Sequence, residues 1–142
     1  MNIAPASQNS FSAAIALLEN CKLPTSDIQP QTRLFVMEEN NKVIGTVALE
    51  HDGCDALLRS LCVEHDYRKK GVAGQLVSFI EHYAQLQEVH NIYLLTTTAV
   101  DFFAKKGYQN TERAQAPRFI QHTSQFASLC TSSAVLMKKI LT

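Results

Sequence analysis

The sequence lacks an excess of charge of either sign and lacks any long hydrophobic run. Its 142 residues carry thirteen Lys or Arg and thirteen Asp or Glu, so the formal net charge is zero. This balance gives no overall reason to expect a nucleic-acid or membrane-surface partner. The apolar runs are too short to span a bilayer, and residues 1–10 lack the cationic and apolar regions of a signal peptide. We therefore expect a cytoplasmic protein with no nucleic-acid and no membrane partner.

Clustered metal ligands and nucleotide-binding signatures are also missing. The four cysteines, Cys21, Cys54, Cys62 and Cys130, contain no CxxC pair, and the histidines show no HxxxH spacing. We therefore expect reduced thiols, at least two of them in the core, with no metal and no disulfide framework. There is no GxxxxGK[ST] and no early GxGxxG with a downstream acid, which disfavours a nucleotide-binding domain.

The most informative stretch lies in the middle of the chain. An apolar, strand-like segment is followed there by Arg68, Lys69 and Lys70, and then by Gly71 and Gly74 at the start of a long amphipathic pattern. Such a loop brings together unpaired backbone N–H groups, the positive end of a helix dipole and side-chain cations. Glycine lets the backbone approach an anion that a Cβ would hold off. The stretch predicts a phosphate or pyrophosphate site, with a plain solvated turn as the alternative.

The rest of the chain alternates between helical and strand patterns and predicts one domain, 1–142. The predicted strands are Asn2–Ala6, Arg33–Glu38, Lys42–Glu50, Ala56–Val63, Asn91–Thr96, Tyr108–Arg113 and Ser133–Ile140. A first helix is predicted to begin at Ser7 or Ser10 and to end near Cys21. The later predicted helices are Gly71–Glu88, Ala99–Lys106 with Thr97 or Thr98 as its N-cap, and Ala116–Ser128.

The connections between these elements predict how the strands pair. Short turns join the three strands between Arg33 and Val63, which favours an antiparallel meander. Because a helix separates Ala56–Val63 from Asn91–Thr96, we expect those two strands to be parallel. The fold class is therefore α+β, with a mixed six- or seven-stranded sheet and helices on both faces.

Two motifs within this order of elements resemble the GNAT acetyltransferase superfamily. The family's acyl-CoA motif is Arg or Gln, two residues, Gly, one residue, and Gly or Ala, and residues 68–73 match it as RKKGVA. A second motif, an aromatic on a short helix followed by three residues, Gly and an aromatic, is matched by residues 103–108, FAKKGY. The resemblance covers about residues 57–108. It implies a GNAT-type sheet and an acetyl-CoA-dependent N-acetyltransferase.

The resemblance also implies where acetyl-CoA binds. The pantetheine arm would lie in a splayed gap between Ala56–Val63 and Ile92–Thr96 and would pair with backbone like an added strand. The pyrophosphate would lie on the cationic glycine loop. The implied cofactor-binding residues are Leu61, Cys62, Val63, Arg68, Lys69, Lys70, Gly71, Val72, Ala73, Gly74, Phe103 and Lys106. In this family a substrate amine usually attacks the thioester directly, while a backbone amide of the fourth strand polarises the carbonyl oxygen.

Phe103 departs from the family pattern. A tyrosine often stands at this position and can protonate the departing CoA sulfur, which phenylalanine cannot do. A thiol with a pKa of about 8.5 still leaves as the thiolate, so turnover does not require that tyrosine. The catalytic residues stay unassigned. By residue type, the candidate general acids are Tyr93 and Tyr108, and the candidate general bases are Glu50, Glu64 and His65. Of these, we keep Glu64 and Tyr108 as the candidates for catalysis. The departure also motivates an alternative function, a GNAT module that binds acyl-CoA as a sensor or partner without turnover.

A narrower resemblance links residues 57–60, 91–103 and parts of 116–134 to the arsenic-resistance N-acetyltransferase subgroup. It implies a small-molecule amine as acceptor, possessing an acidic group, such as an arsenic- or phosphorus-containing glutamate analogue. Arg59 would bind that group, because a guanidinium matches an oxyanion with two hydrogen bonds; a structural salt bridge is the alternative role.

The same resemblance implies further acceptor residues and a partner. Thr96, Thr97 and Thr98 would supply hydroxyls, unless they serve only as strand and N-cap residues. The residues expected to close the pocket are His122, Ser128 and Cys130. A homodimer is common among relatives, and Ser133–Ile140 is the element expected to form its interface.

Overall fold

The computed structural model describes residues 2–23, 25, 26, 28, 32–123 and 134–141. The strands are β1 (Asn2–Pro5), β2 (Arg33–Glu39), β3 (Lys42–Asp52), β4 (Asp55–Val63), β5 (Asn91–Thr96), β6 (Gln109–Asn110) and β7 (Val135–Ile140). The α-helices are α1 (Gln8–Asn20), α2 (Val72–Leu86), α3 (Val100–Lys105) and α4 (Arg118–Gln121), and the 3-10 helices are η1 (His65–Tyr67) and η2 (Arg113–Gln115).

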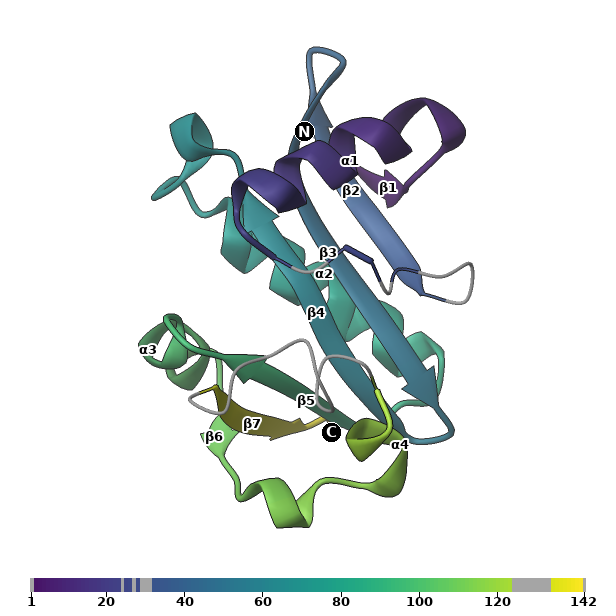
Figure 1. The fold of residues 1–142 in the computed structure, drawn as a ribbon, viewed down its shortest axis with the longest axis vertical. Coiled ribbons are helices and arrows are strands. Elements are labelled where there is room, and N and C mark those ends of the chain that lie inside the picture. Colours follow the sequence, from purple (N-terminus) through teal and green to yellow (C-terminus); the bar gives the residue numbers. More distant parts are fainter. Residues whose placement is uncertain (1, 24, 27, 29–31, 124–133, 142) are drawn as a thin grey trace. The chain divides into compact units, whose positions relative to one another are not determined.

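These strands form one mixed sheet in the order β1-β2-β3-β4-β5-β7-β6 (Figure 1). The α+β class with a mixed sheet is confirmed, and the number of strands is seven. The chain divides into two compact units, residues 1–50 with 58–83, and residues 51–57 with 84–142.

In the first unit, α1 and α2 cover opposite faces of the strands (Figure 1). The face under α1 carries Leu34 and Val36 of β2, which pack with Leu18 of the helix. Phe35 lies between those two residues in the strand, so its side chain points to the other face. There its ring lies 5.0 Å from that of Phe79 on α2. The predicted helices on both faces are thus confirmed in this unit.

Helix α1 begins at one of its two predicted caps. Ser7 is the N-cap, and its hydroxyl accepts a hydrogen bond from the Ser10 N–H. Ser10 returns the interaction, because its Oγ accepts from the Ser7 N–H at 2.8 Å. This reciprocal capping box satisfies backbone donors that the first helical turn leaves unpaired.

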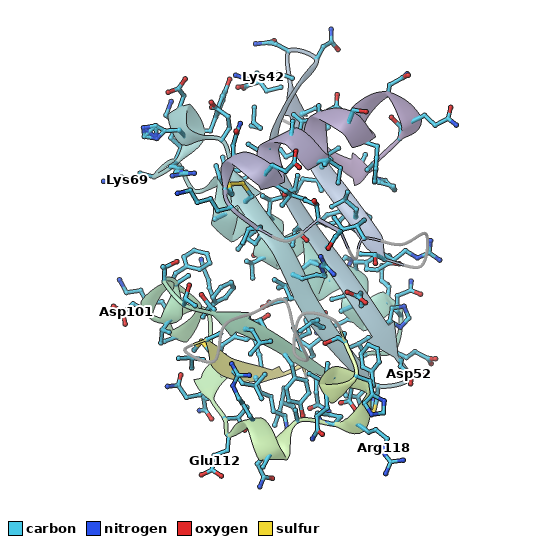
Figure 2. The ribbon with its side chains drawn as sticks, viewed as in Figure 1. Lys42, Asp52, Lys69, Asp101, Glu112 and Arg118 are labelled. Carbon is cyan, nitrogen blue, oxygen red and sulfur yellow. A yellow bond between two sulfur atoms is a disulfide. The ribbon has the colours of Figure 1, made fainter. Side chains whose placement is uncertain are left out.

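The disulfide between Cys21 and Cys62 contradicts the expectation of four reduced thiols (Figure 2). Cys21 caps the C-terminal end of α1, and Cys62 lies on β4 beneath that helix. Packing of the helix on the strand brings their Cα atoms to 6.4 Å, a separation that a disulfide spans. Cys54 is an exposed free thiol, whereas Cys130 lies outside the described residues.

In the second unit, β5 joins a parallel and an antiparallel neighbour. It pairs in parallel with β4 from Asp55↔Asn91 to Leu57↔Tyr93, as predicted from the intervening helix. It pairs antiparallel with β7 from Asn91↔Ile140 to Thr96↔Val135. Leu57, Tyr93 and Leu136 from these strands form a core with Ala116 and Ile120.

Two elements near the C-terminus differ from prediction. The expected strand Tyr108–Arg113 shortens to β6, whose pairing with β7 involves only Gln109 and Asn110. The chain then turns into η2, where Arg113 Nη2 donates to the Ala134 carbonyl at 2.8 Å. The polar run after residue 110 has no apolar alternation to continue a strand.

The helix expected over Ala116–Ser128 is also shorter where it is described. It contains α4, which begins after Pro117 and gives way to a turn at His122. Residues 124–128 of that prediction lie outside the described residues. No helix in the described part of the chain has the length and apolar character needed to cross a bilayer.

Candidate cofactor and acceptor site

The cationic glycine loop connects β4 to α2 in the first unit. Lys69 and Gly71 adopt left-handed backbone angles, with φ of 62° and 81°. The first helical hydrogen bond runs from Gln75 N to Gly71 O at 3.1 Å. The N–H groups at positions 72–74 precede it and so lack partners within the helix, which is the arrangement that binds anions.

The cations of the loop are held by local contacts. Arg68 is exposed, and its Nε donates to the Val63 carbonyl at 3.0 Å. The Lys70 ammonium lies 5.6 Å from the ring centroid of Tyr67. Lys69 projects outward from the loop (Figure 2). The loop thus presents positive charge beside the amides at the start of α2.

The Tyr67 hydroxyl beneath Lys70 has a raised pKa. The largest cause is a hydrogen bond with Glu39, followed by burial and by the negative charges of Glu39, Glu64 and Asp66. Each of these disfavours the phenolate. Tyr67 therefore keeps its proton and a neutral ring at neutral pH, and it faces Lys70 as a cation–π partner.

Gly45 on β3 allows α2 to lie close to the strand. A Cβ at this position would come within 2.8 Å of Leu76 Cδ1 and 3.4 Å of Val72 Cγ1. Both leucine and valine belong to the first turns of α2 and are fully buried. This small residue therefore helps to set the position of the helix N-terminus.

Glu64, a candidate base, has a structural role at the end of β4. Its carboxylate caps η1 by accepting from Asp66 N at 3.0 Å, and its own N–H donates to the Ile44 carbonyl at 2.8 Å. Lys42 Nζ lies 4.0 Å from the same carboxylate. These contacts fix the direction in which the chain leaves β4 for the loop.

Arg59, the predicted acceptor residue, is only 4% exposed. Its Nη1 donates to Glu50 Oε2 at 2.9 Å, and its Nε donates to Ser60 Oγ at 3.2 Å. Ser60 has a φ of 59°, which interrupts the strand geometry of β4, and its carbonyl accepts from Thr46 Oγ1 at 2.8 Å. The salt bridge foreseen as the alternative role of Arg59 is therefore present.

The three threonines lie at the end of β5 in the second unit. Thr96 Oγ1 accepts from the Ala99 N–H at 3.0 Å, whereas Thr97 and Thr98 are exposed. The N-cap of α3 is Ala99, so the predicted caps Thr97 and Thr98 are wrong. The hydroxyl that accepts a hydrogen bond at the start of α3 belongs instead to Thr96.

Phe103 belongs to an aromatic cluster of the second unit. Its ring is 4% exposed and packs edge-on against Phe102 and Tyr108, at 5.1 and 5.5 Å between centroids. Tyr108 itself is 2% exposed. Lys106 is exposed, and its carbonyl accepts from Lys139 Nζ at 2.9 Å. The second motif thus forms a compact helix end, closed by Gly107 at a φ of 97°.

The predicted site residues fall into two groups. The first unit brings together the pyrophosphate loop 68–74, the strand end 61–63 and Arg59, while the second holds 96–98, Phe103, Lys106 and Tyr108. Of the residues expected to close the pocket, His122 is exposed, and Ser128 and Cys130 lie outside the described residues. Sequence reasoning missed the backbone irregularity at Ser60 and the pairing of Glu50 with Arg59. The sequence feature that could have indicated this pairing was Arg59 itself, a cation within an apolar strand.

The fold is similar to that of several solved acetyltransferases. N-acetylglutamate synthase from Neisseria gonorrhoeae, complexed with coenzyme A and N-acetyl-glutamate, matches 99% of this chain with a TM-score of 0.84 and 16% identity. This chain spans only 35% of that synthase. A GNAT-family acetyltransferase from Staphylococcus aureus matches 99% of this chain and 99% of its own, with a TM-score of 0.80 and 17% identity. Tetrahymena GCN5 matches 100% of this chain and 97% of its own, with a TM-score of 0.77 and 16% identity.

A family model assigns the chain more directly. The model of the acetyltransferase (GNAT) domain matches residues 30–110, which is more than half of the chain. The chain therefore belongs to the GNAT acetyltransferase family, whose acetyl donor is acetyl-CoA. The resemblance inferred from the two sequence motifs is confirmed.

Proposed function

We propose that this chain transfers an acetyl group from acetyl-CoA to the primary amine of a small molecule. The observation that carries the proposal is the loop at residues 68–74. Its exposed cations, left-handed turns and helix N-terminal amides would bind an anion, and the loop follows β4 after the short helix η1. A pyrophosphate bound there would leave the pantetheine arm to follow the strand end at Leu61, Cys62 and Val63.

The proposed chemistry is direct attack. The neutral amine forms a C–N bond to the thioester carbonyl, the C–S bond breaks, and the amine loses a proton to a base or to water. A backbone amide of β4 would stabilise the negative charge that develops on the carbonyl oxygen. CoA leaves as the thiolate, since its thiol has a pKa of about 8.5. Substrate positioning supplies much of the rate in such a reaction.

We further propose an acidic, amino-acid-like acceptor, bound through Arg59. The buried Arg59 guanidinium is held in a fixed orientation by Glu50 and Ser60. Carboxylate, phosphinate or arsonate groups match the geometry of a guanidinium, and such an acceptor would share its N–H donors with these partners or displace them. The N-acetyl-glutamate in the complex with the gonococcal synthase provides a precedent in a protein of similar fold. Thr96, Thr97 and Thr98 would supply hydroxyls. This acceptor class would place the chain in the arsenic-resistance subgroup.

Thiol release from acetyl-CoA with a panel of acidic, neutral and basic amines tests this proposal. Arg59→Lys should raise KM for acidic acceptors about tenfold or more, because a point charge replaces a two-pronged donor. It should leave KM for neutral amines and the Kd of acetyl-CoA unchanged, and circular dichroism would check folding. An equal effect on acidic and neutral acceptors would contradict the assignment of Arg59.

Proton transfer in this reaction has two candidates, Glu64 and Tyr108. Loss of a true general acid or base typically lowers kcat by about 10² to 10⁴. Glu64→Gln and Tyr108→Phe keep the shapes of the side chains and separate these roles from the cap and ring contacts described above. A change in kcat below about threefold for both would leave proton transfer to water.

A second function, acyl-CoA binding without turnover, is favoured by one observation. Phe103 occupies the position where relatives often carry tyrosine, and its buried ring offers no proton. Binding of acetyl-CoA with no thiol release above hydrolysis for any amine would support this sensor or partner role.

We also propose that residues 1–142 work as one domain in the cytoplasm, as a homodimer. Light scattering after size-exclusion chromatography measures that oligomeric state.

A further inference from the structure

Arg68 links the pyrophosphate loop to the Cys21–Cys62 disulfide. Its Nη2 lies 3.8 Å from Cys21 Sγ, while its Nε donates to the Val63 carbonyl. One guanidinium at the start of the loop therefore contacts both the disulfide and the end of β4. All of these groups belong to the first unit. A change in the bonding of Cys21 would directly change the surroundings of Arg68.

The surroundings of the two sulfurs suit thiols as well as a disulfide. Cys62 is 4% exposed, but its Sγ lies 3.6 Å from the Leu17 carbonyl, which would accept a hydrogen bond from a Cys62 thiol. Cys21 is half-buried and faces the Arg68 guanidinium, which stabilises a thiolate. Both products of reduction thus have a partner already in place. A buried polar group with a partner carries little penalty, so reduction would leave neither sulfur at a large energetic cost.

We propose that Cys21 and Cys62 are a redox-active pair that controls the affinity of the loop for acetyl-CoA. In the disulfide form, the Cys21 sulfur is a weak neutral acceptor, so the Arg68 charge faces the pyrophosphate. In the reduced form, a Cys21 thiolate pairs with Arg68 and competes with the pyrophosphate for it. The disulfide form therefore binds acetyl-CoA more tightly. The inference rests on the proposed cofactor site but not on the identity of the acceptor.

The redox steps balance with simple reagents. A phosphine reduces the disulfide to two thiols and is itself converted, with one water molecule, to the phosphine oxide. A low-molecular-weight disulfide re-forms the bond through two exchange steps and releases two small thiols. During reduction, the phosphine is expected to attack the Cys21 sulfur, because the Cys62 sulfur is buried. In a reducing compartment, a disulfide is more often a transient, redox-sensing bond than a permanent structural one.

The test measures the Kd of acetyl-CoA by calorimetry in the oxidised and the phosphine-reduced protein. Acetyl-CoA is used because free CoA carries a thiol that would exchange with the disulfide. Reduction should weaken binding about tenfold or more, the effect of one charge-assisted hydrogen bond. Alkylation and mass spectrometry would verify which cysteines are bonded in each sample.

Three variants make the outcome specific. Cys62→Ser retains the Cys21 thiol and should bind like the reduced protein under both conditions. Cys21→Ser removes the thiolate and should be insensitive to phosphine, which keeps the test available if Cys62→Ser fails to fold. Cys54→Ser is the matched control and should respond like wild type, because Cys54 is a free exposed thiol.

Equal Kd values in the two redox states, or no binding in either, would overturn the inference. So would alkylation of Cys21 and Cys62 in the oxidised protein without prior reduction. Failure of the proposed function would give a different result. If the protein shows no turnover but its Kd for acetyl-CoA still depends on the redox state, the proposed acetyl transfer is refuted and the redox control is retained. Turnover with a redox-independent Kd removes the switch alone.

Discussion

Gly45→Ala should destabilise the protein chiefly through one close contact, with Leu76. The added Cβ would lie 2.8 Å from Leu76 Cδ1, whereas carbon atoms prefer separations of about 3.5–4.0 Å. Leu76 has no exposed surface, and Val72 is 1% exposed, so neither side chain can swing into solvent. The start of α2 must therefore move away from β3.

The magnitude follows from two opposing effects. Overpacking a filled core costs about 1–3 kcal/mol. Replacing glycine by alanine also reduces the entropy of the unfolded chain, which stabilises the fold by about 0.4–1 kcal/mol. The net loss should be about 1–2 kcal/mol in the free energy of unfolding, or roughly 3–8 °C in Tm for a chain of this size. Because the displaced turn carries the amides at positions 72–74, acetyl-CoA should also bind less tightly.

Urea unfolding and calorimetric titration with acetyl-CoA measure these two effects. A double-mutant cycle with Leu76→Val isolates the contact, and the double variant should recover at least about 0.5 kcal/mol relative to additivity. Gly53→Ala is the matched control, because its φ of 63° is strained but no atom lies within 4 Å of the new Cβ. It should lose stability without losing acetyl-CoA affinity. Additivity within about 0.3 kcal/mol, or a Gly45→Ala protein as stable as wild type, would refute the reasoning.

Two further predictions concern the pyrophosphate loop. Gly71→Val should weaken acetyl-CoA binding at least about tenfold, because a β-branched residue strains the backbone at a φ of 81° and its side chain would occupy the space an anion needs. No protein atom lies within 4 Å of the new Cβ, so the protein should lose some stability but still unfold cooperatively; an unchanged Kd would remove the loop from the site. Tyr67 should ionise above its ordinary pKa of 10.0 in an ultraviolet titration referenced to Tyr67→Phe, and Glu39→Gln should lower that pKa. Because the pKa of Tyr67 is higher in the folded than in the unfolded protein, the protonated hydroxyl should stabilise the fold below pH 10, and this stabilisation should be lost as the pH rises through the folded pKa. Titration of Tyr67 at or below 10.0 would contradict this prediction.

Local patterns in the sequence were sufficient to locate the glycine loop between β4 and α2 that we propose as the cofactor site. The motif at 68–73 follows an apolar strand and precedes a helical periodicity, and these are properties of neighbouring residues. The same kind of local signal narrowed the N-cap of α1 to Ser7 or Ser10, of which Ser7 is the cap, and predicted the parallel pairing of β4 with β5. Elements supported by weak periodicity were misjudged, since β6 and α4 are much shorter than predicted.

Contacts between distant residues were decided only by tertiary packing. Cys21 and Cys62 are separated by 41 positions, and no spacing rule pairs them until α1 packs on β4. The orientation of Arg59 depends on the register that brings Glu50 beside it and on the left-handed backbone at Ser60. A non-glycine residue adopts that conformation at a cost that surrounding contacts must offset.

By itself, the sequence determined that this chain is a GNAT acetyltransferase, and it predicted an anion-binding loop at residues 68–74, because backbone conformation and helix dipoles arise from adjacent residues. The tertiary structure decided that Arg68 faces a disulfide and that Arg59 faces a carboxylate. Those neighbours come from other elements, and their approach depends on how complete helices and strands pack.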